Sequence, residues 1–227
     1  MILIFENSRE LARGAAEHFV TAAQKDFFTV ALSGGSTPKI LYQLLTEEPF
    51  RTQVPWTRTH FYWSDERHVP PDHPDSNYRM AHEALLSRVP VPESNVHRVH
   101  SENPSAQEAA DEYEKIVVPH LDLIMLGLGA DGHTASIFPG SEVLQETSRL
   151  VAAPWVEKLN TYRITMTLPL LNNGASLLFM VSGAEKAEIV KEVIEGPKKY
   201  PAQYVQPMSG ELIWMLDKDA ASQLSHG

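Results

Sequence analysis

Short apolar runs alternate along the chain with longer stretches in which apolar residues recur every three or four positions. The short runs have the length of strands, and the stretches between them have the spacing of amphipathic helices. The runs predict strands near residues 1–5, 27–32, 59–64, 121–128, 149–153, 162–168, 176–182 and 211–217. The intervening stretches predict helices at residues 8–25, 38–47, 76–88, 105–118 and 183–195.

This alternation of strand and helix predicts an α/β fold built on a mostly parallel sheet flanked by helices. The run that ends at Leu126 is short and aliphatic, as expected for a strand buried on both faces of such a sheet. The strands after residue 149 are also compatible with an antiparallel pair. No composition shift, repeat or low-complexity tract marks a boundary, so we expect a single domain over residues 1–227.

Composition narrows the classes of function. The chain has 227 residues, 43% hydrophobic and 21% charged, which is typical of a globular protein. Its formal net charge of −10 argues against nucleic acid or an anionic membrane as a partner. The absence of cysteine excludes disulfides, a thiolate nucleophile and cysteine-ligated zinc. No apolar run reaches the length of a membrane span or signal segment, so we expect a cytoplasmic protein.

The glycine-rich loop at residues 127–139 carries the strongest candidates for chemistry, Asp131 and His133. It follows a predicted buried strand, and ligands of open α/β sheets bind where such strands end. A histidine with a pKa of about 6.5 can act as a general base, which a nearby carboxylate can orient. The alternative is a hydrogen-bonded structural histidine. The loop also matches G-x-G-x-x-G, but Asp131 would place a negative charge against a pyrophosphate.

A second glycine turn, Ser33-Gly-Gly-Ser-Thr-Pro38, lies between a predicted strand and a predicted helix. Such a turn presents backbone N–H groups at a helix N-terminus, where a phosphate can bind. The alternative is a plain turn with Thr37 as N-cap and Pro38 at the first helical position. It lacks the Gly-Lys-Ser/Thr ending of a Walker A motif.

Three cations are candidates for binding an anion: Arg67, Arg163 and Lys186. Arg67 follows an apolar run, and its planar guanidinium can make two charge-assisted hydrogen bonds to one oxyanion. The alternative is that Asp65 or Glu66 pairs with Arg67 or caps the next turn. Beyond them, Ser76 is a candidate helix cap and Asn77 a candidate ligand contact.

Other catalytic chemistry has little support. The remaining histidines form no H-E-x-x-H or similar metal-ligand pattern, and no G-x-S-x-G elbow indicates a serine nucleophile. We therefore predict a reaction that needs no metal and no cofactor.

Taken together, several blocks resemble the 6-phosphogluconolactonase family, and their order and spacing agree over nearly the whole chain. The blocks are Ser33-Gly-Gly-Ser-Thr-Pro38, Trp63-Ser-Asp-Glu-Arg67, Ser76-Asn-Tyr78, Gly127-Leu-Gly-Ala-Asp-Gly-His-Thr-Ala-Ser136, Arg163, Gly183-Ala-Glu-Lys186 and Trp214-Met-Leu-Asp217.

The resemblance implies a modified Rossmann-like fold and hydrolysis of 6-phospho-D-glucono-1,5-lactone in the pentose phosphate pathway. His133 would activate water, with Asp131 beside it. By similarity, the phosphate would be held by Gly34, Gly35, Ser36, Arg163 and Lys186, and the substrate would also contact Arg67 and Asn77. The expected partner is the phosphosugar lactone alone, bound by a monomer or weak homodimer.

Three other functions stay open. Glucosamine-6-phosphate deaminases belong to the same superfamily and would use a carboxylate such as Asp65 as base. They are expected to carry a glutamate five residues after the histidine, where this chain has Phe138. A sugar-phosphate sensor would need a DNA-binding element, for which the predicted first strand leaves no room. An oxidoreductase would use the glycine loop for a nucleotide.

Overall fold

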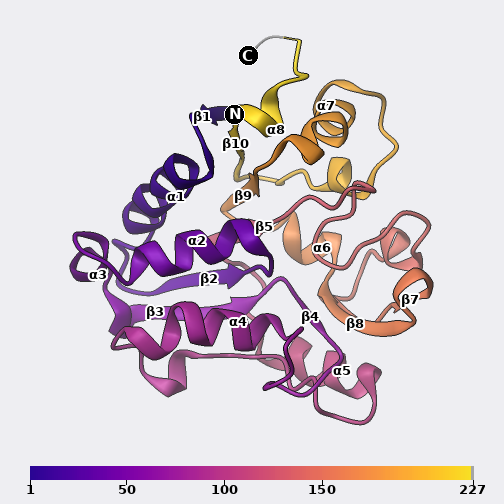
Figure 1. Ribbon diagram of the computed structural model, residues 1–227. Coiled ribbons are helices and arrows are strands. Elements are labelled where there is room, and N and C mark those ends of the chain that lie inside the picture. Colours follow the sequence, from indigo (N-terminus) through magenta and orange to yellow (C-terminus); the bar gives the residue numbers. More distant parts are fainter. Residues whose placement is uncertain (226–227) are drawn as a thin grey trace.

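A six-stranded parallel sheet forms the centre of the computed structural model, which describes residues 1–225 (Figure 1). In spatial order the strands are β1 (Ile2–Phe5), β10 (Glu211–Asp217), β9 (Ser176–Val181), β5 (Leu123–Leu126), β2 (Phe28–Leu32) and β3 (Thr59–Trp63). Every neighbouring pair in this sheet is parallel. The predicted fold class is therefore confirmed.

Helices cover both faces of this sheet. One hydrophobic cluster packs under α1 (Ser8–Ala22), α2 (Ser36–Leu45), α3 (Phe50–Gln53) and α4 (Asn77–Ala84). The other packs under α5 (Ala106–Ile116), α6 (Leu168–Leu171), α7 (Ala187–Glu195) and α8 (Lys218–Ala221). Short 3-10 turns occur at Trp56–Arg58, Leu86–Arg88, Glu93–Asn95, Glu142–Gln145, Glu157–Leu159, Ala184–Lys186 and Pro201–Tyr204.

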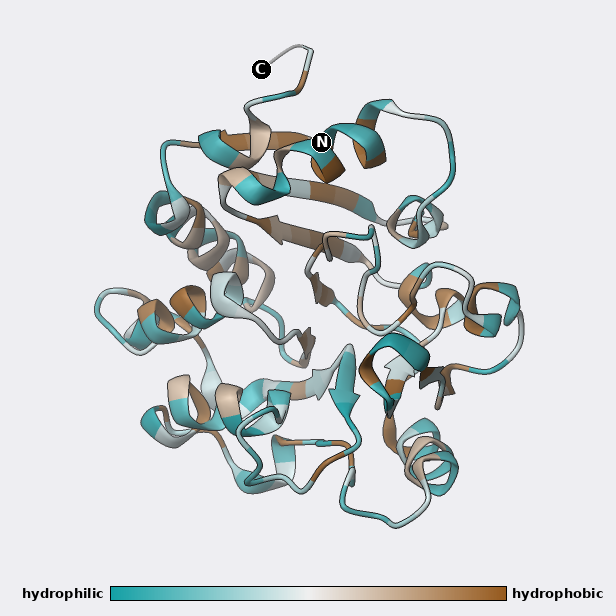
Figure 2. Ribbon diagram, turned by 45° about the vertical axis from the view of Figure 1, so that its right-hand side comes forward, coloured by the Kyte–Doolittle hydropathy of each residue, from teal (hydrophilic) through white to brown (hydrophobic). Residues whose placement is uncertain are grey.

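Strand β5 explains why an unbroken aliphatic run marks the middle of the sheet. Leu123 and Met125 belong to the cluster under α1–α4, whereas Ile124 and Leu126 belong to the cluster under α5–α8. Successive side chains of a strand point to opposite faces, so a strand covered on both sides needs apolar residues throughout. Figure 2 shows these apolar strands between helices whose outer faces are hydrophilic.

A small antiparallel sheet lies beside the main one. It consists of β4 (Asp65–Arg67), β8 (Thr161–Met166) and β6 (Val151–Ala152), and β7 (Trp155–Val156) also pairs with β8. The sequence left an antiparallel pair after residue 149 open, and the structure contains such pairs. Strands β4 and β7 were not predicted, because two or three residues are too few to show a periodicity.

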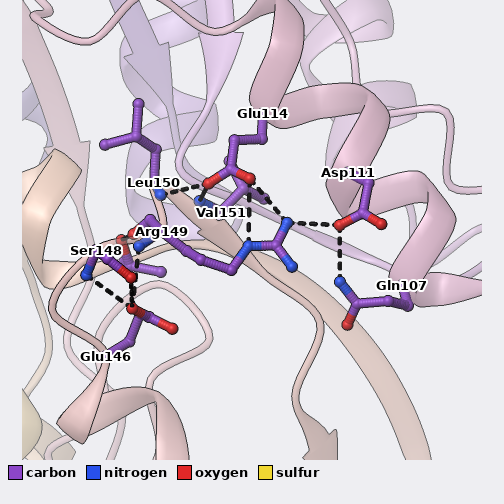
Figure 3. Close-up of polar contacts among 9 residues, drawn as sticks. Gln107, Asp111, Glu114, Glu146, Ser148, Arg149, Leu150 and Val151 are labelled. Carbon is purple, nitrogen blue, oxygen red and sulfur yellow. Dashed lines mark hydrogen bonds and ion pairs between the residues drawn. The ribbon is translucent and has the colours of Figure 1, made fainter.

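The carboxylate of Glu114 ties the small sheet to helix α5 (Figure 3). It accepts hydrogen bonds from the backbone N–H groups of Leu150 and Val151, at 2.5 and 3.2 Å, and from the guanidinium of Arg149. Arg149 also donates to Asp111 on the same helix. Burial alone would raise the pKa of Glu114, but these donors outweigh it and lower that pKa. One ionised side chain thus fixes the start of β6 against α5.

The start of helix α2 corrects one expectation. The helix begins at Ser36 with Gly35 at the N-cap, and no side chain caps it. Thr37 is therefore not the N-cap, and Pro38 is the third helical residue; the Thr37 hydroxyl bonds instead to Ser182, at 2.8 Å. Gly35 has φ of 114°, a conformation that glycine adopts readily, and this sets where the helix starts. The predicted cap of α4 at Ser76 is confirmed.

None of the helices in residues 1–225 is long and apolar enough to cross a membrane.

Replacing Glu114 with alanine is expected to lower the free energy of unfolding by about 1–3 kcal/mol, because two backbone donors and Arg149 lose their acceptor. Urea denaturation measures the loss. Glu112→Ala on the same helix is the matched control, because Glu112 is half exposed and should cost less than about 0.5 kcal/mol. Equal losses in the two variants would contradict the role given to Glu114.

Candidate active site

A cavity of about 370 Å³ opens at the carboxyl ends of β2 and β5. β2 and β5 are neighbours in the sheet. The strand of this sheet that follows β2 in the chain is β3, which lies on one side of the pair, and the strand that follows β5 is β9, which lies on the other side. Such a reversal of strand order leaves a crevice in open α/β sheets. The wall is formed by Ser33, Gly34, Gly35, Asp65, Arg67, Asn77, Gly127, Leu128, Gly129, His133, Ala135, Ser136, Phe138, Lys158, Leu159, Arg163 and Lys186. Of the predicted site residues, Asp131 and Ser36 alone are not part of this wall.

The loop after β5 is closed by its own hydrogen bonds. The backbone N–H of Gly129 donates to the carbonyl of His133, at 2.9 Å, and the hydroxyl of Thr134 donates to the carbonyl of Gly127, at 2.9 Å. A Cβ atom on Gly129 would overlap the His133 ring. The glycine-rich composition therefore lets the loop fold tightly around the imidazole.

The His133 imidazole is held by Asp131 on the same loop. His133 Nδ1 lies 2.5 Å from Asp131 Oδ1, and the other carboxylate oxygen forms an ion pair with Lys158. An ionised carboxylate only accepts hydrogen bonds, so the Nδ1 proton points to Asp131. Nε2 then remains as the basic nitrogen of a ring that lines the cavity.

The surroundings of this pair set its charge state. Burial lowers the pKa of His133, partly offset by the hydrogen bond from its ring to Asp131. Burial would by itself raise the pKa of Asp131, but the hydrogen bonds from Lys158 and His133 bring it down to about 2. At neutral pH the site therefore holds a neutral imidazole beside an ionised carboxylate.

Arg67 and Arg163 face each other across β4 and β8. They are direct register partners in this antiparallel pair, and the Nε of each is buried without a hydrogen-bond partner. Burial lowers the pKa of Arg163, and the neighbouring charge of Arg67 lowers it further. Within residues 1–225 neither guanidinium forms an ion pair with a carboxylate. Two like charges opposite each other are destabilising, so this pair is suited to an anion.

The glycine turn at residues 33–38 forms another part of the cavity wall. Asn77 is buried and donates through Nδ2 to the backbone carbonyl of Asp65, at 2.9 Å. A Cβ atom on Gly34 would overlap the Asn77 amide, so this turn packs directly against the side chain. Ser36 begins α2 with an exposed side chain outside the cavity wall.

Lys186 enters from the strand β9 side. It closes the 3-10 turn that precedes α7, and its ammonium donates to the carbonyl of Leu128, at 2.9 Å. This bond holds the side chain against the loop of His133 and uses one of its three hydrogens. The remaining hydrogens are available to an acceptor in the cavity.

The two carboxylates before Arg67 have different tasks. Glu66 is buried and accepts hydrogen bonds from the backbone N–H groups of Asn77 and Tyr78, at 2.8 and 2.7 Å. The alternative that one of these carboxylates caps the next turn is correct for Glu66. Asp65 lines the cavity and accepts a hydrogen bond from Ser136, at 2.6 Å.

Sequence reasoning missed Lys158 and treated Phe138 only as a departure from another family. The Phe138 ring stacks on His133 with centroids 4.2 Å apart, and the Lys158 ammonium lies 4.5 Å from the centre of the same ring. Asp131 and Lys158 are 27 residues apart in the chain. No local pattern could have revealed the contact, because the fold brings these two segments together.

Comparison with known proteins agrees with this arrangement. Residues 6–214 match the model of the family described as glucosamine-6-phosphate isomerases/6-phosphogluconolactonase. The chain belongs to this family. A 6-phosphogluconolactonase of Synechocystis is 41% identical over 215 residues, which are 89% of this chain and 87% of the relative.

Solved structures share the fold over nearly the whole chain. The 6-phosphogluconolactonase of Trypanosoma brucei has a TM-score of 0.88 at 29% identity and covers 99% of this chain and 98% of its own. A monomeric glucosamine-6-phosphate deaminase also has a TM-score of 0.88, at 18% identity, covering 98% of this chain and 99% of its own. The second likeness concerns the fold alone.

Inorganic phosphate is expected to stabilise the protein, because it would supply the missing partner of Arg67 and Arg163. At roughly 100 times Kd the gain is about 2–3 kcal/mol, seen as a higher thermal midpoint. Arg163→Met should lose most of this gain. Arg58→Ala, which removes an exposed ion pair with Asp26, should keep it. A full phosphate effect in Arg163→Met would rule out the arginine pair as the anion site.

Proposed function

We propose that this chain hydrolyses 6-phospho-D-glucono-1,5-lactone to 6-phosphogluconate, with His133 as the general base. The observation that carries the proposal is the Asp131–His133 hydrogen bond in a cavity whose wall also contains two arginines with no carboxylate partner among residues 1–225. The first feature fits activation of water, and the second fits a phosphorylated substrate. The names of the relatives support the same reaction.

In the proposed reaction, Nε2 of His133 removes a proton from water as the oxygen bonds to the lactone carbonyl carbon. The carbonyl electrons move to oxygen, giving a tetrahedral oxyanion. Arg67 and backbone N–H groups of the loop at residues 127–139 are the donors available to stabilise it. The bond to the ring oxygen then breaks, and the protonated imidazole returns its proton to that oxygen. The ionised Asp131 stabilises the imidazolium between these steps.

The phosphate at the other end of the substrate anchors it. Gly34, Gly35, Arg163 and Lys186 all line the cavity and are proposed to hold this group, with Arg67 and Asn77 contacting the substrate. Each charge-assisted hydrogen bond contributes roughly 1.5–3 kcal/mol. Ser36, whose side chain is exposed, would contribute through its backbone N–H at the start of α2.

Deamination of an amino-sugar phosphate is less well supported. The expected glutamate of that reaction is replaced by Phe138, whose ring stacks on the imidazole with an angle of 30° between the ring planes. An apolar ring there cannot relay a proton. Hydrolysis of the lactone would place the chain in the pentose phosphate pathway, as expected from the resemblance.

His133→Ala is expected to lower the enzyme-dependent rate of acid release from freshly generated 6-phosphogluconolactone by about 10²–10⁴-fold, since the base is lost. The spontaneous rate is subtracted. The exposed His120→Ala provides the control and should hydrolyse the lactone at the wild-type rate. Wild-type activity in a folded His133→Ala protein would remove His133 as the base, and ammonia release from glucosamine-6-phosphate would favour the deaminase.

Lys186→Ala is expected to reduce the preference for the phosphorylated lactone over unphosphorylated gluconolactone by about 10-fold or more, because one charge-assisted contact to phosphate is lost. The ratio of kcat/KM for the two substrates measures this preference. Lys191→Ala, an exposed lysine of α7, should leave the ratio unchanged. The assignment fails if Lys186→Ala also leaves it unchanged.

A further inference from the structure

Lys158 is a cation of the cavity wall to which the proposed reaction gives no task. It lies in the 3-10 turn Glu157–Leu159 between β7 and β8, with its side chain about half exposed. Its ammonium forms an ion pair with Asp131 Oδ2, whereas Asp131 Oδ1 faces the imidazole of His133. The carboxylate is therefore shared, one oxygen to each partner.

Lys158 also reaches the base by a second route. Its ammonium lies over the ring of Phe138, 4.5 Å from the centroid, and the other partner of that ring is the imidazole of His133. An ammonium at this distance from an aromatic face is attracted to it. The same lysine thus contacts both groups that hold the imidazole in place.

The hairpin that carries Lys158 is held together by contacts between its own residues. Trp155 and Tyr162 are register partners across β7 and β8, and their rings meet edge to face at 4.9 Å. The indole N–H of Trp155 donates to Glu157, at 2.8 Å. Asn160 adopts the left-handed conformation that turns the chain into β8. These contacts all lie within residues 155–162, so they define the shape of the hairpin that presents Lys158 to Asp131.

The charges around His133 give the ion pair a consequence. Asp131 on its own loop and Asp65 on β4 both favour the protonated imidazole, whereas Lys158 opposes them. The cavity wall also contains the cations Arg67, Arg163 and Lys186. A protonated imidazole cannot accept a proton from water, so a cation beside Asp131 keeps the base in its working form at neutral pH.

We propose that Lys158 is a positioning residue of the active site, which holds the Asp131 carboxylate against His133 and offsets its negative charge. The proposal rests on the proposed function for its catalytic meaning. The ion pair and the stacked ring give it a structural basis that can be measured without turnover.

The test compares Lys158→Met with Lys158→Arg in two measurements. NMR titration of the His133 ring from about pH 5 to pH 9 reports its protonation directly, and the acid limb of kcat/KM reports it through the reaction. In Lys158→Met both are expected to move to higher pH. The rate should then fall about 3–10-fold near pH 6 but less than about twofold near pH 9, with KM nearly unchanged. Lys158→Arg should restore the wild-type profiles.

Lys25→Met is the matched control, because Lys25 is also half exposed and also paired with an aspartate, Asp122. That pair lies at the other end of β2, so both profiles should stay as in the wild type. An unmoved His133 titration in Lys158→Met would overturn the proposal. If KM rose at the same time, Lys158 would instead be a substrate-binding residue. Absence of lactone hydrolysis by the wild type would refute the proposed function but leave the titration test intact.

Discussion

Burial of β5 on both faces of a parallel sheet is the constraint on which the rest of the molecule depends. Its four residues are all buried, two toward each hydrophobic cluster. A strand in this position ends at the edge where β2 and β9 also end, so three loops that are distant in the sequence open onto one cavity. The main sheet therefore determines where chemistry can occur, and the loops determine which chemistry it is.

The small antiparallel sheet has a different part. It contributes Val151, Ile164 and Met166 to one hydrophobic cluster, and it carries Arg67, Arg163 and the hairpin of Lys158 to the cavity. Its attachment through Glu114 and its internal pairing keep these cations near one another in spite of their mutual repulsion. Two neighbouring arginines without a carboxylate partner, as Arg67 and Arg163 are within residues 1–225, are unfavourable in an empty protein and favourable in one that binds an anion. The charge of the cavity is thus opposite to the net charge of −10 of the chain.

The sequence predicted the structure well where only one kind of residue is compatible with the position, as in a strand buried on both faces or a tight glycine loop. Unbroken apolar runs predicted the parallel strands, and the glycine loop predicted where His133 and Asp131 would lie. Strands β4 and β7 left no periodicity to read, and Thr37 looked like a cap because the conformation of Gly35 is invisible in a sequence. The role of Lys158 could not be predicted, because its partners Asp131 and Phe138 belong to a distant loop that only the folded chain brings close to it.

The aromatic ring of Phe138 has one more consequence. It covers one face of the His133 imidazole, while Asp131 occupies the nitrogen at the far edge. The lone pair of Nε2 lies in the plane of the ring, so in the proposed reaction a water molecule approaches along that plane. A planar carbonyl held in the cavity would present two faces, and this base would serve only one of them. Phe138 and Asp131 together hold the orientation of the ring, and that orientation decides which carbonyl face the proposed base would serve.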